Sequence, residues 1–243
     1  MSMIRIAFAL LPVFLLFVPV PALPAGNDHS LLLKMNKPCS PDNLVIPHSG
    51  DYDTWRLASS GLTREAFDQA VKGYDHLLHM GLITNSSILT IIDYSRPSTA
   101  KRFYILDMHA GSLLINTLVA HGRNSGYNYA TAFSNEESSY KSSLGFFITG
   151  NTYTGANGYS LQLKGCEPGI NDKAMERAVV LHGAAYVSEA FIRSRGYLGR
   201  SLGCPAVPLA EHKRIINIIK NGTCMFFYHP AGRYSPHSTI LDS

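Results

Sequence analysis

Short runs rich in β-branched and aromatic residues dominate this chain from Ser87 onward, and they constrain its fold more than any other feature. Two of these runs, 102–108 and 112–122, flank a His-Ala-Gly turn, a pattern typical of a β-hairpin. Such residues fit the pleated, half-buried surface of a sheet. We therefore predict a mainly β domain with peripheral helices. Its expected strands are 87–95, 102–108, 112–122, 144–150, 153–163, 178–183 and 223–229.

One helix is predicted ahead of these strands, at 61–81, with Thr63 as its N-cap and Gly81 at its end. Leu62 and Phe67 are placed to form a hydrophobic staple around the cap. The apolar residues of this segment recur at helical spacing and predict one buried face. They are Phe67, Ala70, Val71, Tyr74, Leu77 and Leu78.

Three shorter helices are predicted among the strands, at 171–178, 185–196 and 209–222. The last has an expected buried stripe, formed by Leu209, Ile215, Ile216 and Ile219. The run 153–163 is expected to turn back on itself at Asn157-Gly158. The polar stretch 122–143 lacks apolar periodicity, and loops of this length are usually functional or disordered.

The N-terminal 25 residues have the pattern of a secretory signal peptide. Arg5 precedes an apolar run at 6–18, and Ala22 and Ala25 offer cleavage sites; an uncleaved anchor is the alternative. The predicted protein is exported to the periplasm or cell envelope, with no membrane span once the signal is removed. Residues 26–84 are then a lead-in and helical extension, 85–230 the main domain and 231–243 a C-terminal tail.

The net charge of +4 is modest, and no basic stripe alternates with aromatic residues. Nucleic-acid binding is therefore not expected. Export permits disulfides, and the chain has four cysteines. If Cys204 is free, at most one bridge forms among Cys39, Cys166 and Cys224, and the sequence does not identify the pair. His76 and His79 have no third ligand nearby in sequence, so no metal site is predicted.

The segment from His182 to Cys204 concentrates the chemically useful residues. A thiolate is the attacking form of cysteine, and an imidazole can accept its proton and later protonate a leaving amine. Cys204 is thus the candidate nucleophile and His182 the candidate base. The N–H groups of Gly203 and Cys204 are candidate oxyanion donors, because a glycine-containing turn leaves such groups free. Ser201 is expected to hydrogen-bond either the turn or the base.

This pattern, His182-Gly183 followed by Ser201-x-Gly203-Cys204, resembles the L,D-transpeptidase (YkuD-type) family. The runs 121–126, 132–147, 158–165 and 199–208 are similar to its murein L,D-transpeptidase members. The resemblance implies a β-sandwich or barrel catalytic domain over 85–230. It also implies acyl transfer on peptidoglycan stem peptides through a thioester, giving 3→3 cross-links without a metal or organic cofactor. An L,D-carboxypeptidase or a non-catalytic peptidoglycan-binding module are the alternatives.

Four further residues are candidates for substrate binding. His121 opens a second His-Gly pair and is expected to line the cleft or to replace His182 as the base. Arg123 and Arg200 suit a substrate carboxylate, and Gly183 adjoins the base. Leu202 stands where many family members carry a histidine, and Pro205-Ala206-Val207 replaces polar or basic residues. These departures flank the thiol and therefore bear on recognition of the leaving group or acceptor.

Overall fold

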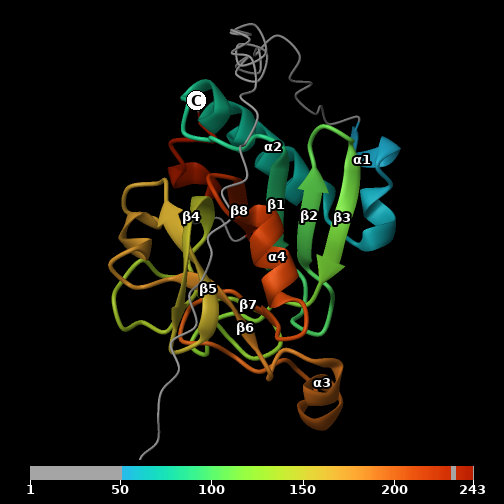
Figure 1. Ribbon diagram of the computed structural model, residues 1–243, viewed down its shortest axis with the longest axis vertical. Coiled ribbons are helices and arrows are strands. Elements are labelled where there is room, and N and C mark those ends of the chain that lie inside the picture. Colours follow the sequence, from blue (N-terminus) through green and yellow to red (C-terminus); the bar gives the residue numbers. More distant parts are fainter. Residues whose placement is uncertain (1–50, 231–233, 243) are drawn as a thin grey trace, which may run out of the picture. The chain divides into compact units, whose positions relative to one another are not determined.

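The computed structural model describes residues 51–230 and 234–242. The predicted signal peptide, the lead-in up to residue 50 and Cys39 lie outside these residues. Within them, eight strands form one mixed sheet in the order β3-β2-β1-β8-β4-β5-β6-β7 (Figure 1). The strands are β1 (Ile88–Asp93), β2 (Phe103–Asp107), β3 (Ser112–Thr117), β4 (Gly145–Gly155), β5 (Gly158–Gly165), β6 (Val180–Ala184), β7 (Ala206–Pro208) and β8 (Cys224–Tyr228).

The sheet curls until its two edges meet. Ala120, just beyond β3, forms an antiparallel bridge with Ala206 of β7, and its N–H donates to Ala206 O at 2.8 Å. Two strand pairs, β1–β8 and β6–β7, are parallel, and the remaining pairs are antiparallel. This nearly closed barrel confirms the prediction of a mainly β domain with peripheral helices.

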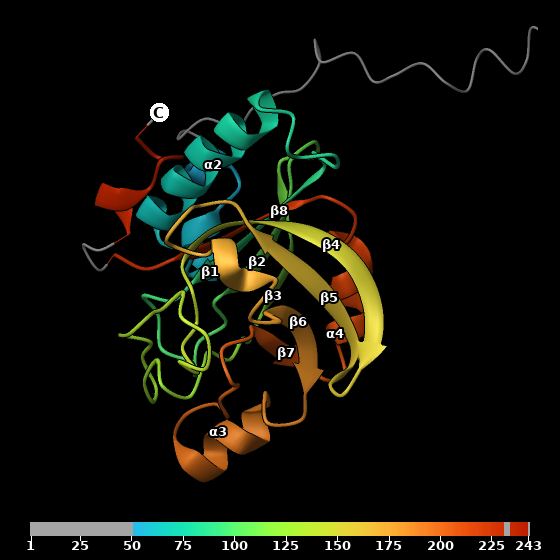
Figure 2. The same ribbon diagram turned by 90° about the vertical axis from the view of Figure 1, so that its left-hand side faces the viewer.

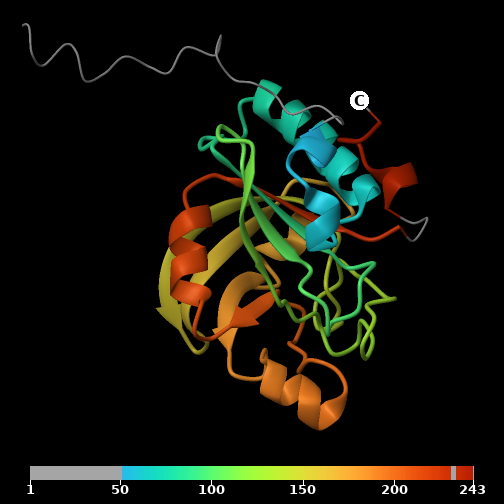
Figure 3. The same ribbon diagram turned by 90° about the vertical axis from the view of Figure 1, so that its right-hand side faces the viewer.

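Helices α2 (Arg64–His79) and α4 (His212–Ile219) pack on opposite faces of the sheet (Figures 2 and 3). The predicted cap of α2 is present, since Thr63 Oγ1 accepts from the Ala66 N–H at 3.3 Å. The predicted apolar face is buried except at Leu78, which is half-buried. Ahead of α2 lie α1 (Asp51–Thr54) and a 3-10 turn at Leu57–Ser60, and α3 (Glu189–Arg195) projects beyond β6 and β7. No helix in the described ranges is long and apolar enough to cross a membrane.

The predicted helix at 171–178 is wrong, because the structure has only a 3-10 turn at Asp172–Ala174. The expected cap, Asn171, bonds elsewhere: its amide donates to Leu144 O at 2.8 Å and Phe146 O at 3.0 Å, and its Oδ1 accepts from the Glu167 N–H at 2.9 Å. The side chain that was expected to start a helix therefore ties β4 to the loop that follows β5.

Two other boundaries differ from the predictions. The run 144–150 and the first residues of 153–163 form one strand, because β4 extends from Gly145 to Gly155 with a bulge between Thr149 and Thr152. The hairpin predicted within 153–163 is present, and its turn lies at residues 156–157, one residue before the predicted Asn157-Gly158. Leu209 is exposed and precedes α4, whose buried stripe consists of Ile215, Ile216 and Ile219. The β-bulge explains the first error, since it breaks the period-two pattern inside one strand.

The C-terminal residues 234–242 do not behave as a tail, because several of their side chains are buried around Glu167. Glu167 is fully buried, and its carboxylate accepts from Tyr234 OH at 3.1 Å, from the Ser238 hydroxyl at 2.5 Å and from the Phe146 N–H at 2.7 Å. Tyr234 also packs against Phe226 of β8. This segment is thus part of the domain core.

Candidate active site

Cys204 lies in the short connection between α3 and β7, alongside β6. In the parallel pairing of these strands, His182 lies opposite Ala206, two residues beyond Cys204. The His182 N–H also donates to Pro205 O at 3.3 Å. Backbone pairing therefore holds the thiol-bearing and imidazole-bearing segments side by side.

Ser201 closes the turn that carries the cysteine. Its Oγ donates to Cys204 O at 2.6 Å and accepts from the Gly203 N–H at 3.0 Å. Of the two backbone donors expected for an oxyanion hole, the N–H of Gly203 is thus engaged. In the part of the chain that the structure describes, the N–H of Cys204 has no acceptor in another residue. It therefore remains the candidate oxyanion donor of this turn, and in this structure it faces the Cys204 thiol.

Two glycines allow the turn to lie directly against its neighbouring segment. A Cβ on Gly122 would lie 3.0 Å from Gly203 Cα and 2.5 Å from Tyr140 O. Gly203 itself has φ of 129°, where a side chain is rarely accommodated, and a Cβ there would lie 2.9 Å from Lys141 O. The backbone around the thiol therefore requires glycine at both positions.

Ser142 joins this turn to the long polar loop. Its hydroxyl donates to Gly203 O at 3.1 Å and accepts from the Gly122 N–H at 3.0 Å. Its own N–H donates to Ser125 Oγ at 2.9 Å. The loop 122–143 thus forms one wall of the candidate site.

The Cys204 thiol is free of any disulfide and partly exposed. Its Sγ accepts from the Val180 N–H at 3.5 Å and faces Ala178 O at 3.7 Å. Burial raises the pKa of Cys204 above its usual 9.0, while the Val180 N–H and the Arg177 charge act in the opposite direction. The thiol is therefore protonated at neutral pH.

His182 is nearly buried, and its Nδ1 faces Gly183 O at 3.1 Å. Because a carbonyl only accepts, Nδ1 carries the proton and Nε2 has the available lone pair. Burial lowers the pKa of His182 below its usual 6.5, aided by His212 and opposed by Gly183 O. The imidazole is therefore neutral at pH 7. Gly183 lies directly against His212, since a Cβ there would lie 2.5 Å from the His212 ring.

A cavity of about 310 Å³ opens at the thiol. Leu202, at the position that departs from the family pattern, lies on it and is 62% exposed. The lining consists of Glu137, Ser138, Tyr140, Glu176, Arg177, Ala178, Val179, Leu202 and Cys204. A peptide could reach the sulfur from this side.

His121 occupies a buried position that excludes contact with a substrate. Arg102 Nη2 donates to its Nδ1 at 2.6 Å, and its Nε2 donates to Gly126 O at 3.3 Å. Burial and the Arg102 charge lower the pKa of His121 to about 3. Both ring nitrogens are engaged, so this residue supports the loop and is not suited to replace His182 as base.

The two arginines expected to bind a carboxylate are packed on aromatic rings. Arg200 lies 4.4 Å from the Tyr127 ring and donates to Arg123 O and Gly126 O, each at 3.2 Å. Arg123 lies 4.1 Å from the ring of Tyr140, which lines the cavity. Arg123 thus packs on a residue of the cavity without lining it, and Arg200 stabilises the loop through Arg123 and Gly126.

Sequence reasoning missed Arg177, whose guanidinium lines the cavity beside Cys204. The sequence gives one weak indication of this residue: it stands five residues before His182, next to an apolar strand. Ser142 was also missed, since it is one of several serines in a polar loop and only tertiary contacts distinguish it.

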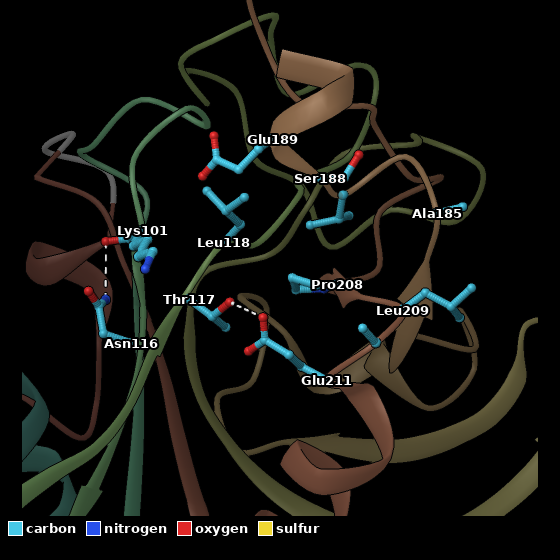
Figure 4. Close-up of a pocket in the computed structure, with 12 residues that line it drawn as sticks. Lys101, Asn116, Thr117, Leu118, Ala185, Ser188, Glu189, Pro208, Leu209 and Glu211 are labelled. Carbon is cyan, nitrogen blue, oxygen red and sulfur yellow. Dashed lines mark hydrogen bonds between the residues drawn. The ribbon is translucent and has the colours of Figure 1, made fainter. Parts of the chain in front are cut away.

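A larger cavity of about 720 Å³ lies where β3, β6 and β7 end (Figure 4). Thr117 Oγ1 donates to Glu211 Oε1 at 3.2 Å within it. Neither Cys204 nor His182 lines this cavity. This larger cavity is therefore not the candidate reacting site, despite its volume.

Comparisons with known proteins identify the family of this chain. A family model described as the L,D-transpeptidase catalytic domain matches residues 58–228. No curated protein matches the chain.

Three solved L,D-transpeptidase structures resemble it at low identity. The Mycobacterium smegmatis enzyme is 12% identical over 59% of each chain, with a TM-score of 0.38. L,D-transpeptidase 3 from Mycobacterium tuberculosis is 10% identical over 59% of this chain and 61% of its own, with a TM-score of 0.38. An Enterococcus faecium mutant is 14% identical over 58% and 50%, with a TM-score of 0.34. The chain thus matches less than two thirds of the length of these proteins.

Proposed function

Because the chain belongs to the L,D-transpeptidase catalytic-domain family, we propose that it is a cysteine acyltransferase acting on peptidoglycan stem peptides. The observation that carries this proposal is the free, partly exposed thiol of Cys204 on an open cavity. The neutral imidazole of His182 on the adjoining strand supports it. Since its substrate is wall polymer, we place the protein outside the cytoplasmic membrane.

In the first half-reaction, Nε2 of His182 takes the proton from Cys204 Sγ. The sulfur attacks the carbonyl of the L-centre that is joined to the terminal D-alanine of a tetrapeptide stem. The Cys204 N–H donates to the developing oxyanion. His182 then returns the proton to the leaving amine, and D-alanine departs as a thioester forms.

In the second half-reaction, an amine of a neighbouring stem attacks the thioester. His182 accepts the amine proton and returns it to the sulfur as the carbon–sulfur bond breaks. The product is a 3→3 cross-link and the free thiol. Each step uses only side chains and backbone groups, so the proposed mechanism needs no metal or organic cofactor.

Incubation of the purified protein with disaccharide-tetrapeptide, followed by mass spectrometry, tests this function. We expect a cross-linked dimer that has lost one D-alanine. Disaccharide-tripeptide alone would instead identify an L,D-carboxypeptidase, because water would have resolved the thioester. Absence of both products and of any acyl-enzyme would identify a non-catalytic binding module.

The pH dependence of kcat/KM is expected to have an acid limb below pH 6.5. Burial lowers the pKa of His182, so its base form persists to more acid pH and is lost only below that value. His182→Ala should lower the rate about 10²–10⁴-fold and remove this limb. The measurement is kcat/KM from pH 4 to 8, with circular dichroism at each pH. A limb at or above pH 6.5, or one retained in the variant, would contradict the assignment.

A further inference from the structure

Arg177 is a half-buried cation that forms no salt bridge within the described residues, although the charge of Glu136 acts on it. Its Nη1 donates to Ser134 O at 2.8 Å and to Ser143 Oγ at 2.5 Å, and its Nη2 donates to Lys141 O at 2.8 Å. No carboxylate of the described residues lies within ion-pair distance of it. Burying an uncompensated guanidinium costs free energy, so its place beside the thiol calls for a reason.

The guanidinium adjoins the turn that carries the nucleophile. A Cβ built on Gly203 would lie 3.7 Å from Arg177 Nη2. The next residue, Ala178, has its carbonyl oxygen 3.7 Å from Cys204 Sγ. Arg177 and Cys204 also line the same cavity, and Arg177 contributes its only positive charge. The charge is therefore close to the sulfur.

Two of its five N–H donors have no partner. Two acceptors engage Nη1, and one engages Nη2. Within residues 51–230 and 234–242, the Nε–H and one of the two Nη2 hydrogens are therefore without an acceptor. A guanidinium with free donors is suited to an anion. The three engaged donors hold it in place, so it needs no reorganisation when charge develops.

Other titratable groups surround the thiol. Glu137, Glu176 and Tyr140 lie on the cavity, and His182 follows on β6. Tyr94 and Tyr186 are close enough for a thiolate to raise their pKa values. The two carboxylates are exposed and therefore screened by solvent. None of these groups carries a positive charge before the thiol proton moves. The imidazole of His182 becomes a second positive charge only once it has taken that proton, whereas Arg177 is charged throughout.

We propose that Arg177 is the fixed counter-charge of the anion that forms at Cys204. It lowers the free energy of the thiolate when His182 removes the thiol proton. Its effect passes through Cys204, so Arg177 is a positioning residue of the site. The inference rests on the proposed function only in taking Cys204 as the nucleophile.

The test is the pH dependence of Cys204 alkylation by iodoacetamide, followed by peptide mass spectrometry, because only the thiolate reacts. Arg177→Gln should raise the apparent thiol pKa by about 1 unit or more and slow alkylation at pH 7.5 about tenfold. Arg177→Lys should restore part of this rate. Arg193→Gln, which removes an exposed arginine of α3, should leave it unchanged.

An unchanged thiol pKa in folded Arg177→Gln would overturn the inference. Should that variant fail to fold, Arg177→Met is the second neutral replacement and is judged by the same result. Ser143→Ala removes one anchor of the guanidinium but keeps its charge. An equal rise of the thiol pKa in Ser143→Ala would show that the effect comes from the loop structure, and it would also overturn the inference. Alkylation needs no peptidoglycan, so this outcome is independent of the dimer assay.

Discussion

Replacing Cys204 by alanine is expected to lower the transpeptidation rate at least about 10⁴-fold, because no other group at the site can form the thioester. The acyl-enzyme mass found after incubation with disaccharide-tetrapeptide should disappear at the same time. The backbone of the turn does not use the sulfur to close, since Ser201 makes those hydrogen bonds. The variant should therefore fold and bind substrate.

The matched control is Cys166→Ala. Cys166 is also free, but it lies in the loop after β5 and does not line the cavity. Burial raises its pKa to about 12, so it is a poor nucleophile at neutral pH. We expect full activity and an unchanged acyl-enzyme mass. If the acyl-enzyme still forms in Cys204→Ala, or no longer forms in Cys166→Ala, Cys204 is not the nucleophile.

Replacing Glu167 by alanine is expected to destabilise the domain by about 3 kcal/mol or more, although Glu167 does not line the thiol cavity. Its carboxylate accepts hydrogen bonds from Phe146, Tyr234 and Ser238. Each buried donor left without an acceptor costs about 1–3 kcal/mol. The melting temperature should fall by roughly 10 °C. Urea unfolding followed by circular dichroism measures the free energy.

Glu189→Ala on α3 is the control, because this exposed carboxylate should contribute less than about 1 kcal/mol. The dependence on pH gives a second check. Burial raises the pKa of Glu167 above its usual 4.5. Its stabilisation is then complete below pH 4.5 and declines as pH rises through the folded-state pKa. The difference in unfolding free energy between the wild type and Glu167→Gln should therefore decrease as pH rises above 4.5. A difference that increases with pH would contradict this account.

Local signals explain which elements were predictable. The start of α2 follows from Thr63 and from apolar residues that repeat within a few turns. The strand at His182 and the turn at Cys204 are likewise defined by adjacent residues. The helix expected after Asn171 failed because a side chain suited to a cap had stronger partners on β4. The cap signal alone does not exclude such partners.

The two His-Gly pairs look alike in sequence, and only the fold separates their roles. His121 lies beside Arg102, which directly precedes β2. The Arg102 guanidinium donates a hydrogen bond to the His121 ring and keeps the ring neutral. Among the described residues, no arginine donates to His182, and its Nε2 stays available. Arg123, Arg200 and Arg177 cannot be told apart by sequence, yet of these three only Arg177 lines the cavity with Cys204.

The sequence by itself determined the mainly β fold, the identity of the candidate nucleophile and base, and their place in one short segment. Those features depend on residue type, alternation and spacing, which act over a few residues. Tertiary structure alone decided which charges surround the sulfur and that Tyr234 closes the core over Glu167, 67 residues earlier. Such contacts depend on strand order and on the curling of the sheet, which bring together residues far apart in the chain.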